Sequence, residues 1–177
     1  HHKRFRDKAF LAFLRNPICR DLGGCLAPFN AFLMSVGLES LGVRIERHCA
    51  NAERVARFLA AHPRVRAVRY PGLPDHPDHA LARRQFGGRF GAVLTLTLAS
   101  RDQAFQFING LKLAQTLANL GDARTLVIHP ASTFCRDLSD ADRQAVGVND
   151  ALVRLAVGLE HPDDLIADVD QSLTRLR

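Results

Sequence analysis

The stretch Ala151-Leu-Val-Arg-Leu-Ala-Val-Gly-Leu-Glu160 decides how the rest of the sequence is interpreted. Its residues alternate as in a β-strand, which puts two sets of side chains on two faces. One face carries Val153, Leu155, Val157 and Leu159, and the other carries Leu152, Arg154, Ala156 and Gly158. A guanidinium on a half-buried sheet needs a partner, and its planar fork of N–H donors matches a carboxylate or a phosphate. The pattern therefore predicts either an anion-binding floor at Arg154 or an internal bridge from Arg154 to an Asp or Glu.

Length and composition are those of a globular protein. The chain has 177 residues, of which 47% are hydrophobic and 24% are charged, so one compact domain is expected. The net charge of +6 comes almost wholly from arginine, because Lys3, Lys8 and Lys112 are the only lysines. The arginines are scattered and aromatic residues make up only 7% of the chain, which argues against a nucleic-acid partner. A non-enzymatic basic module that binds anions or nucleic acid remains the alternative function.

The cysteines and histidines do not form a pattern typical of a metal site. Cys19, Cys25, Cys49 and Cys135 include no CxxC pair and no zinc-type spacing to histidine, so we expect reduced thiols and no metal. Without a membrane-length apolar run or a signal-peptide pattern, the expected location is cytoplasmic, with no membrane partner. A cysteine hydrolase that uses Cys135 with His129 is a further, less favoured alternative.

Hydrophobic periodicity predicts alternating helices and strands. We expect helices over about 30–61, 78–86, 101–111, 139–147 and 161–176, and strands over 65–70, 92–98, 125–128 and 151–160. His48 lies on the apolar arc of the first helix and is expected to be a hydrogen-bonded core histidine. The predicted fold is an α/β sandwich: a small mixed or antiparallel sheet covered by helices.

Several multi-residue motifs give a more specific indication. They are Leu120-Gly-Asp-Ala123, Ile128-His-Pro-Ala-Ser-Thr133, Leu152-Val-Arg-Leu-Ala-Val-Gly-Leu-Glu160 and Asp163-Asp-Leu-Ile-Ala-Asp168. In this order they resemble the C-terminal part of the Cys/Met-metabolism family of pyridoxal-phosphate enzymes, which includes cystathionine γ-synthase, γ-lyases and O-acetylhomoserine sulfhydrylase. The resemblance covers about residues 9–177. Asn119, where many lyases of the family have serine, is most similar to the sulfhydrylase branch.

The resemblance implies a particular place in a larger enzyme. Residues 1–28 would be the tail end of the cofactor domain and a linker, and residues 29–177 the C-terminal domain of a fold-type I enzyme, beginning with a long linking helix. The implied reaction of the full-length parent is replacement at Cγ of an O-acyl-homoserine by sulfide, in methionine biosynthesis. The implied partners are an amino-acid substrate and further copies of the same chain, since the family forms tetramers.

The resemblance also implies site residues. Arg154 would bind the substrate α-carboxylate, and Asn119 with the backbone of Leu120 would line the same pocket, next to Thr133 and Phe134. Phe134 stands where the family has a threonine. The family's Schiff-base lysine, in a Ser-x-Thr-Lys setting, has no counterpart among Lys3, Lys8 and Lys112. Pyridoxal phosphate would therefore be attached outside this chain, which we expect to hold no catalytic residue and to be inactive alone.

Overall fold

The chain forms two compact units, one that ends at Leu41 and one that runs from Gly42 onward. The computed structural model describes residues 2–176, and the side chains of all of these except His2, Asn16 and Pro17. This division differs from the expected domain boundary at residue 28, which stays a prediction. No described helix is both long and apolar enough to cross a membrane.

The first unit is helical. Its elements are α1 (His2–Phe5), η1 (Arg6–Lys8), α2 (Ala9–Phe13), the π-helix η2 (Leu14–Arg20) and α3 (Pro28–Glu39). Pro28 lies at the start of α3, where its missing N–H costs nothing. Phe29, Phe32, Leu33 and Met34 of α3 are all more than half exposed within the described chain. A helix that is apolar on several sides is typical of one buried against other protein.

The expected single linking helix is in fact two helices, which corrects the sequence-based prediction. Helix α3 ends at Glu39 and α4 (Leu41–Ala61) begins after Ser40, whose φ of −101° and ψ of 6° leave the helical region. Two glycines, Gly37 and Gly42, lie on either side of the break. Glycine is less favourable than alanine in a helix by about 1 kcal/mol. The sequence around Ser40 therefore supports a continuous helix less well than the apolar pattern suggested.

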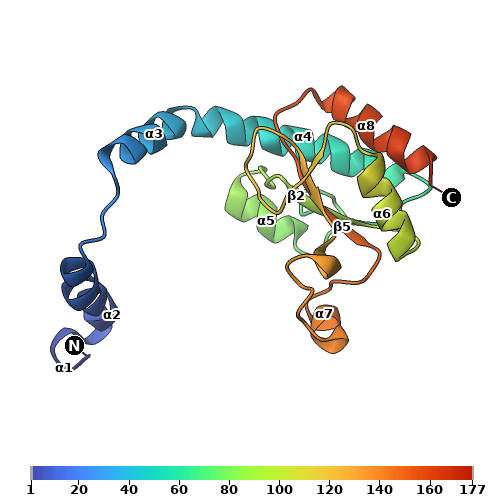
Figure 1. Cartoon of the computed structure of the whole chain (residues 1–177). Coiled ribbons are helices and arrows are strands. Elements are labelled where there is room, and N and C mark those ends of the chain that lie inside the picture. The colour runs from blue at the N-terminus through green and yellow to red at the C-terminus, as the bar shows by residue number, and fades with distance from the viewer. Residues whose placement is uncertain (1, 177) are drawn as a thin grey trace. The chain divides into compact units, whose positions relative to one another are not determined.

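The second unit is built on a five-stranded sheet with the order β1-β2-β5-β4-β3. The strands are β1 (Ala67–Arg69), β2 (Val93–Thr97), β3 (Gln115–Thr116), β4 (Leu126–Ile128) and β5 (Leu152–Ala156). All neighbours pair antiparallel except β3 and β4, which are parallel. The sheet is therefore mixed, as expected, and β5 is its central strand. Figure 1 labels β5 and its neighbour β2.

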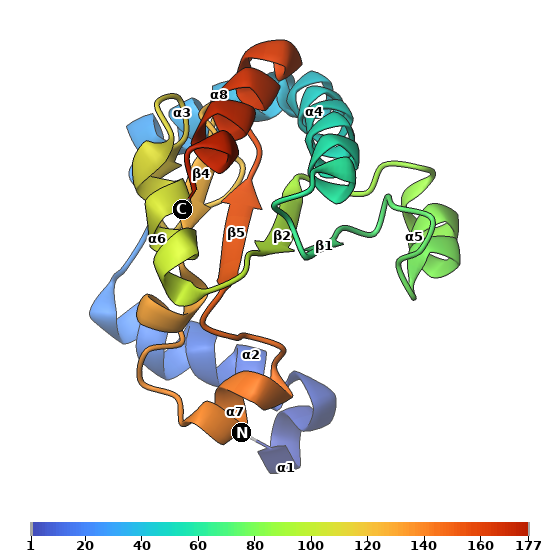
Figure 2. The same cartoon turned by 90° about the vertical axis from the view of Figure 1, so that its right-hand side faces the viewer.

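Helices cover one face of this sheet. The second unit has α4, α5 (His79–Phe86), α6 (Arg101–Gly110), the short η3 (Pro130–Ser132), α7 (Asp140–Ala145) and α8 (Pro162–Thr174). Helices α4, α6 and α8 lie on the same side of β2 and β5 (Figure 2). Their apolar side chains, such as Leu59, Phe107 and Leu173, pack with Leu96 and Leu155 into one core. The predicted apolar face of β2 is confirmed, because Leu94, Leu96 and Leu98 are buried.

Helix α4 also holds the chain segment that leaves β5. His48 is buried, and its Nδ1 donates to the carbonyl of Val157 at 2.7 Å, because a carbonyl can only accept. The prediction of a hydrogen-bonded core histidine is thus confirmed. One turn later, the amide of Asn51 donates to the carbonyls of Gly158 and Glu160 at 3.0 and 2.8 Å. Residues 157–160 are therefore fixed to the core side of the unit.

Candidate functional site

Arg154 lies in the middle of the central strand, on the face away from the core helices. It pairs with Thr95 of β2 and with Ile128 of β4, and its side chain is half-buried. Its Nη1 donates to the backbone carbonyl of Asn119 at 3.3 Å. Among the described residues, no carboxylate lies within 4.0 Å of this guanidinium. The described contacts therefore contain no internal bridge for Arg154, and its hydrogen bond to Asn119 uses one of its five N–H donors.

The loop between β3 and β4 brings Asn119 to Arg154. The amide N–H of Leu120 donates to Oδ1 of Asn119 at 2.9 Å, which fixes the Asn119 side chain and leaves its NH₂ group as a donor. Gly121 turns the chain with a φ of +74°, a conformation that favours glycine. Asn119 and Leu120 themselves are exposed. Together with the guanidinium, the NH₂ group of Asn119 presents hydrogen-bond donors on an open surface.

The same loop ends in a short ion pair. Both the backbone N–H and Nε of Arg124 donate to Oδ1 of Asp122, at 3.0 and 3.2 Å. These hydrogen bonds lower the pKa of the Asp122 carboxyl and raise that of Arg124. Because the pair is exposed, its role is to shape the loop rather than to add much stability.

A second set of hydrogen bonds joins the end of this loop to the segment after β5. Glu160 accepts from the backbone N–H of Thr125 at 2.6 Å and from the Thr125 hydroxyl at 2.9 Å. The same hydroxyl accepts from the backbone N–H of Gly158 at 2.9 Å. The N–H of Leu159 donates to the carbonyl of Ala123 at 2.8 Å. We call Thr125, Gly158 and Glu160 the Glu160 latch. The sequence analysis missed it, although an isolated glycine in an apolar strand is a signal of close backbone approach.

The other two predicted site residues lie on the chain after β4. The hydroxyl of Thr133 donates to the carbonyl of His129 at 2.8 Å, and Phe134 is 59% exposed. The described contacts bring together Arg154 and Asn119, with Leu120 next to it, but they do not join Thr133 or Phe134 to this group. A role for Thr133 and Phe134 beside a ligand therefore stays a prediction.

The geometry disfavours a cysteine hydrolase. Nε2 of His129 donates to the carbonyl of Asp150 at 2.8 Å, and its Nδ1 lies 2.8 Å from the Ser132 hydroxyl. Both ring nitrogens are thus engaged with groups other than Cys135, which is itself buried. A general base must reach the thiol proton, and His129 is not placed to do so. Within residues 2–176, no group of three or more metal-ligating side chains comes together.

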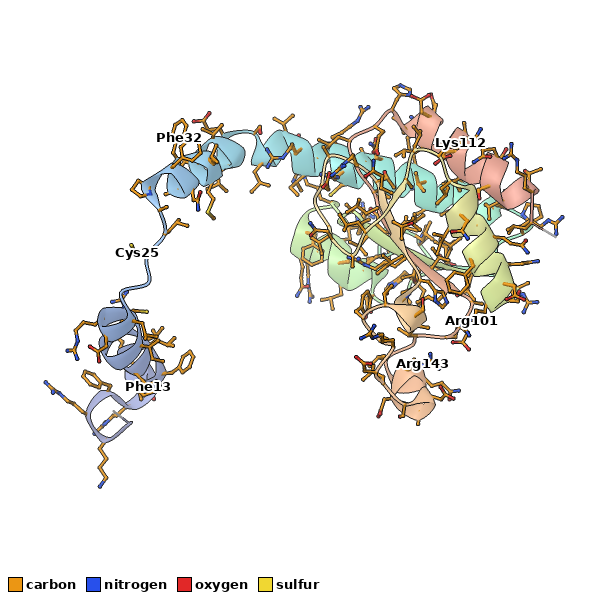
Figure 3. All side chains as sticks on the ribbon, in the orientation of Figure 1. Phe13, Cys25, Phe32, Arg101, Lys112 and Arg143 are labelled. Atoms are coloured by element: carbon orange, nitrogen blue, oxygen red, sulfur yellow. The ribbon has the colours of Figure 1, made fainter. Side chains whose placement is uncertain are left out.

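A polar cavity of about 290 Å³ lies at the other end of the sheet, between α6 and α7. Three arginines line it, and Figure 3 labels two of them, Arg101 at the start of α6 and Arg143 on α7. Arg143 pairs with Asp140 and, at 3.4 Å, with Asp150. Arg136 lies 3.4 Å from its neighbour Asp137. The positive charge of the cavity is thus largely balanced by carboxylates from the same segment.

Comparison with known proteins connects this geometry to chemistry. Residues 4–174 match the family described as Cys/Met metabolism PLP-dependent enzymes. The chain belongs to this family. It is 45% identical over 170 residues to the homocysteine synthase of Schizosaccharomyces pombe and to O-acetyl-L-homoserine sulfhydrylase 1 of Thermus thermophilus, in each case over 96% of the chain and 40% of the relative. It is 43% identical over 173 residues to the O-succinylhomoserine sulfhydrylase of Mycobacterium tuberculosis, over 95% of the chain and 42% of that protein.

Solved structures of similar proteins have the same fold. An O-acetylhomoserine sulfhydrylase of Wolinella succinogenes superposes with a TM-score of 0.76 at 34% identity, over 97% of this chain and 46% of that one. A Campylobacter jejuni structure, described as an O-acetylhomoserine (thiol)-lyase, contains a pyridoxyl-lysine phosphate. It superposes with a TM-score of 0.82 at 39% identity, over 95% of this chain and 39% of that one. The chain thus spans about 40% of the length of the relatives it matches. The predicted family and fold are confirmed.

None of the three lysines makes a described contact with Arg154 or Asn119. Lys3 and Lys8 are exposed residues of the first unit. Lys112 lies on the loop after α6, where its backbone N–H donates to Asp168 of α8 (Figure 3). This contact places Lys112 with the helices that cover the core face, whereas Arg154 lies on the opposite face. The donors of the Arg154 guanidinium match the geometry of an anion such as a carboxylate or a phosphate.

Proposed function

We propose that this chain is the C-terminal part of a pyridoxal-phosphate-dependent O-acylhomoserine sulfhydrylase, in which Arg154 binds the α-carboxylate of the amino-acid substrate. One observation carries the proposal: Arg154 is half-buried on the central strand, it bonds to Asn119, and it has no carboxylate partner within the described part of the chain. The names of the relatives support the choice of reaction. O-acetylhomoserine is our first choice of substrate.

The residues act by holding one end of the substrate. An arginine has five N–H donors, and Arg154 uses one of them on the carbonyl of Asn119. The others can take a carboxylate in a two-pronged geometry, which fixes both the position and the plane of that group. The NH₂ group of Asn119, whose oxygen is held by Leu120, supplies a further donor. Fixing the carboxylate in this way orients the bonds at Cα and Cγ for reaction.

Thr133 and Phe134 complete the proposed pocket. Because Phe134 offers an exposed apolar ring where the family has a hydroxyl, it would contact the carbon chain or the acyl group of the substrate rather than its carboxylate. Pyridoxal phosphate, when bound by the complete enzyme, supplies the electron sink for chemistry at the substrate carbons. The three lysines here lack the Ser-x-Thr-Lys setting of the family, so we expect this chain alone to be inactive. Assembly into a homo-oligomer, a tetramer as in the family, belongs to the same proposal.

The test is a sulfhydrylation assay on the complete protein that carries this chain. Homocysteine formation from O-acetylhomoserine and sulfide is measured for the wild type, for Arg154→Ala and for Arg57→Ala. Arg57 is a matched control, since it is an exposed arginine on α4 that pairs with Glu53. We expect Arg154→Ala to lower kcat/KM by about 30-fold or more, from the 2–5 kcal/mol cost of removing one partner of a buried charge pair, and Arg57→Ala to leave it unchanged. No homocysteine from the wild type, or equal rates for the two variants, would contradict the proposal.

A further inference from the structure

We propose that the Glu160 latch positions the Asn119 loop against Arg154, so that Glu160 and Thr125 are positioning residues for binding of the substrate carboxylate. This inference rests on the proposed function. The latch residues do not touch the proposed carboxylate position; they act through the loop that carries Asn119 and Leu120.

The hydrogen bonds within the loop join it mainly to itself and to β3. The contacts from Leu120 to Asn119 and from Arg124 to Asp122 join residues one or two positions apart, and Nη1 of Arg124 donates to the side chain of Gln115 at 3.0 Å. The bond from Arg154 to Asn119, at 3.3 Å, lies at the long end for a hydrogen bond. Local bonds of this kind do not fix where a loop sits on a sheet. That position is set at its ends, by the pairing of β3 with β4 and by the latch.

Each group of the latch has one defined direction of hydrogen bonding. The Thr125 hydroxyl gives its proton to Glu160 and accepts the N–H of Gly158, so both of its capacities are used. The other oxygen of Glu160 accepts the Thr125 backbone N–H. Within residues 2–176 no arginine or lysine pairs with Glu160, so its charge acts on these two donors. Charge-assisted bonds of this kind are roughly twice as strong as neutral ones.

The β5 side of the latch is the fixed side. Asn51 of α4 holds the carbonyls of Gly158 and Glu160, and His48 holds that of Val157. The loop side comes unusually close to this frame. A Cβ on Gly158 would lie 2.5 Å from both the Ala123 carbonyl oxygen and the backbone carbon of Arg124. The loop is therefore seated directly on the backbone after β5, and glycine is needed at this position for it to sit there.

Strand β5 and the segment directly after it thus carry the proposed ligand group and the anchor. Gly158 follows Arg154 by four residues, or about 13 Å along an extended chain. The loop contacts residues 154–160 at two points, through the Asn119 carbonyl at Arg154 and through residues 123–125 at the latch. A loop held at the second point keeps Asn119 and Leu120 in register with the guanidinium at the first.

The test uses the complete protein with Thr125→Val, Thr125→Ser and Thr97→Val. Valine removes the hydroxyl and keeps the shape, and serine keeps the hydroxyl. Thr97 on β2 is a matched control for the same change, because it lies in a strand of the same sheet away from the latch. Steady-state constants for both substrates are measured, together with amide hydrogen exchange of residues 119–124.

We expect Thr125→Val to raise KM for the amino-acid substrate about 10-fold, the scale of one lost charge-assisted hydrogen bond, with KM for sulfide unchanged and kcat within about twofold. Exchange at residues 119–124 should speed up, while exchange in α4 and α8 should stay as in the wild type. Thr125→Ser and Thr97→Val should both behave as the wild type. If Thr125→Val fails to fold, Glu160→Gln, which keeps one acceptor oxygen, should give the same pattern at smaller size.

Two results distinguish a failure of the latch proposal from a failure of the proposed function. An unchanged amino-acid KM in Thr125→Val and Glu160→Gln, in a protein where Arg154→Ala weakens binding, would overturn the latch and leave the proposed function standing. An unchanged KM in Arg154→Ala would overturn the proposed function itself. A general loss of protection across α4 and α8 in Thr125→Val would show a purely structural role, and would also overturn the positioning role.

Discussion

Gly158→Ala is the change for which the structure gives the clearest magnitude. The added Cβ would lie 2.4 Å from a carboxylate oxygen of Glu160 and 2.5 Å from two backbone atoms of residues 123 and 124. A carboxylate can swing away, but backbone held by the Leu159 to Ala123 hydrogen bond cannot move without breaking it. Overpacking costs about 1–3 kcal/mol, and each hydrogen bond lost adds about 1 kcal/mol. We therefore expect Gly158→Ala to lower the free energy of unfolding by about 2–4 kcal/mol.

Gly42→Ala is the matched control. A Cβ on Gly42 would meet nothing within 4 Å, and the residue lies in the first turn of α4. Alanine is the better helix former, so this variant should be as stable as the wild type or more stable by up to about 1 kcal/mol. Guanidinium-induced unfolding of the three proteins measures the difference. A Gly158→Ala protein as stable as the wild type, or equal losses in both variants, would refute the close approach of the loop to the segment after β5.

Three further outcomes follow from buried groups. Burial raises the pKa of Tyr70, whose hydroxyl donates to the Gly91 carbonyl at 2.9 Å. The neutral form of Tyr70 therefore stabilises the fold below about pH 10, and this stabilisation is lost as the pH rises above that value. Alkaline unfolding should be less steep in Tyr70→Phe, and an identical pH profile would count against this. Asp168 accepts the backbone N–H groups of residues 112–114 at 2.8, 2.9 and 3.3 Å, so Asp168→Ala should cost about 1.5–3 kcal/mol in denaturant unfolding, and a loss below about 0.5 kcal/mol would be inconsistent with this role. Leu96 is fully buried and Leu113 is 42% exposed, so Leu96→Ala should cost about 2–5 kcal/mol and Leu113→Ala much less, and similar thermal shifts for both would contradict the assigned core.

The sequence predicted the strands and helices of the second unit well, because their apolar residues recur with a clear period. Strand β5 shows where this reasoning stops. Its alternation predicted one buried and one partly open face, yet Leu152 and Ala156 are buried as well as Val153 and Leu155. The residues beside Arg154 are covered by tertiary neighbours, which no local pattern reveals. Strand β3, of only two residues, was missed for the same reason, since it exists through its pairing with β4.

For the site, the sequence supplied chemistry and the structure supplied proximity. The motifs indicated Arg154 and Asn119, and the structure joins them by a hydrogen bond. The sequence could not indicate that Thr125 and Glu160, which are 35 residues apart, are hydrogen-bonded to each other. Long-range contacts of polar side chains depend on the packing of whole elements, and here helix α4 holds the Gly158 and Glu160 carbonyls through Asn51.

The central claim is that Arg154 recognises the carboxylate of the substrate, and a comparison of two ligands tests it most directly. In the complete protein, the dissociation constants of an unreactive amino acid and of its α-carboxamide analogue are measured for the wild type and for Arg154→Ala. The account predicts that the wild type binds the carboxylate form at least about 30-fold more tightly, and that Arg154→Ala loses most of this preference because it weakens only that form. A preference for the carboxylate that persists undiminished in Arg154→Ala would contradict the account.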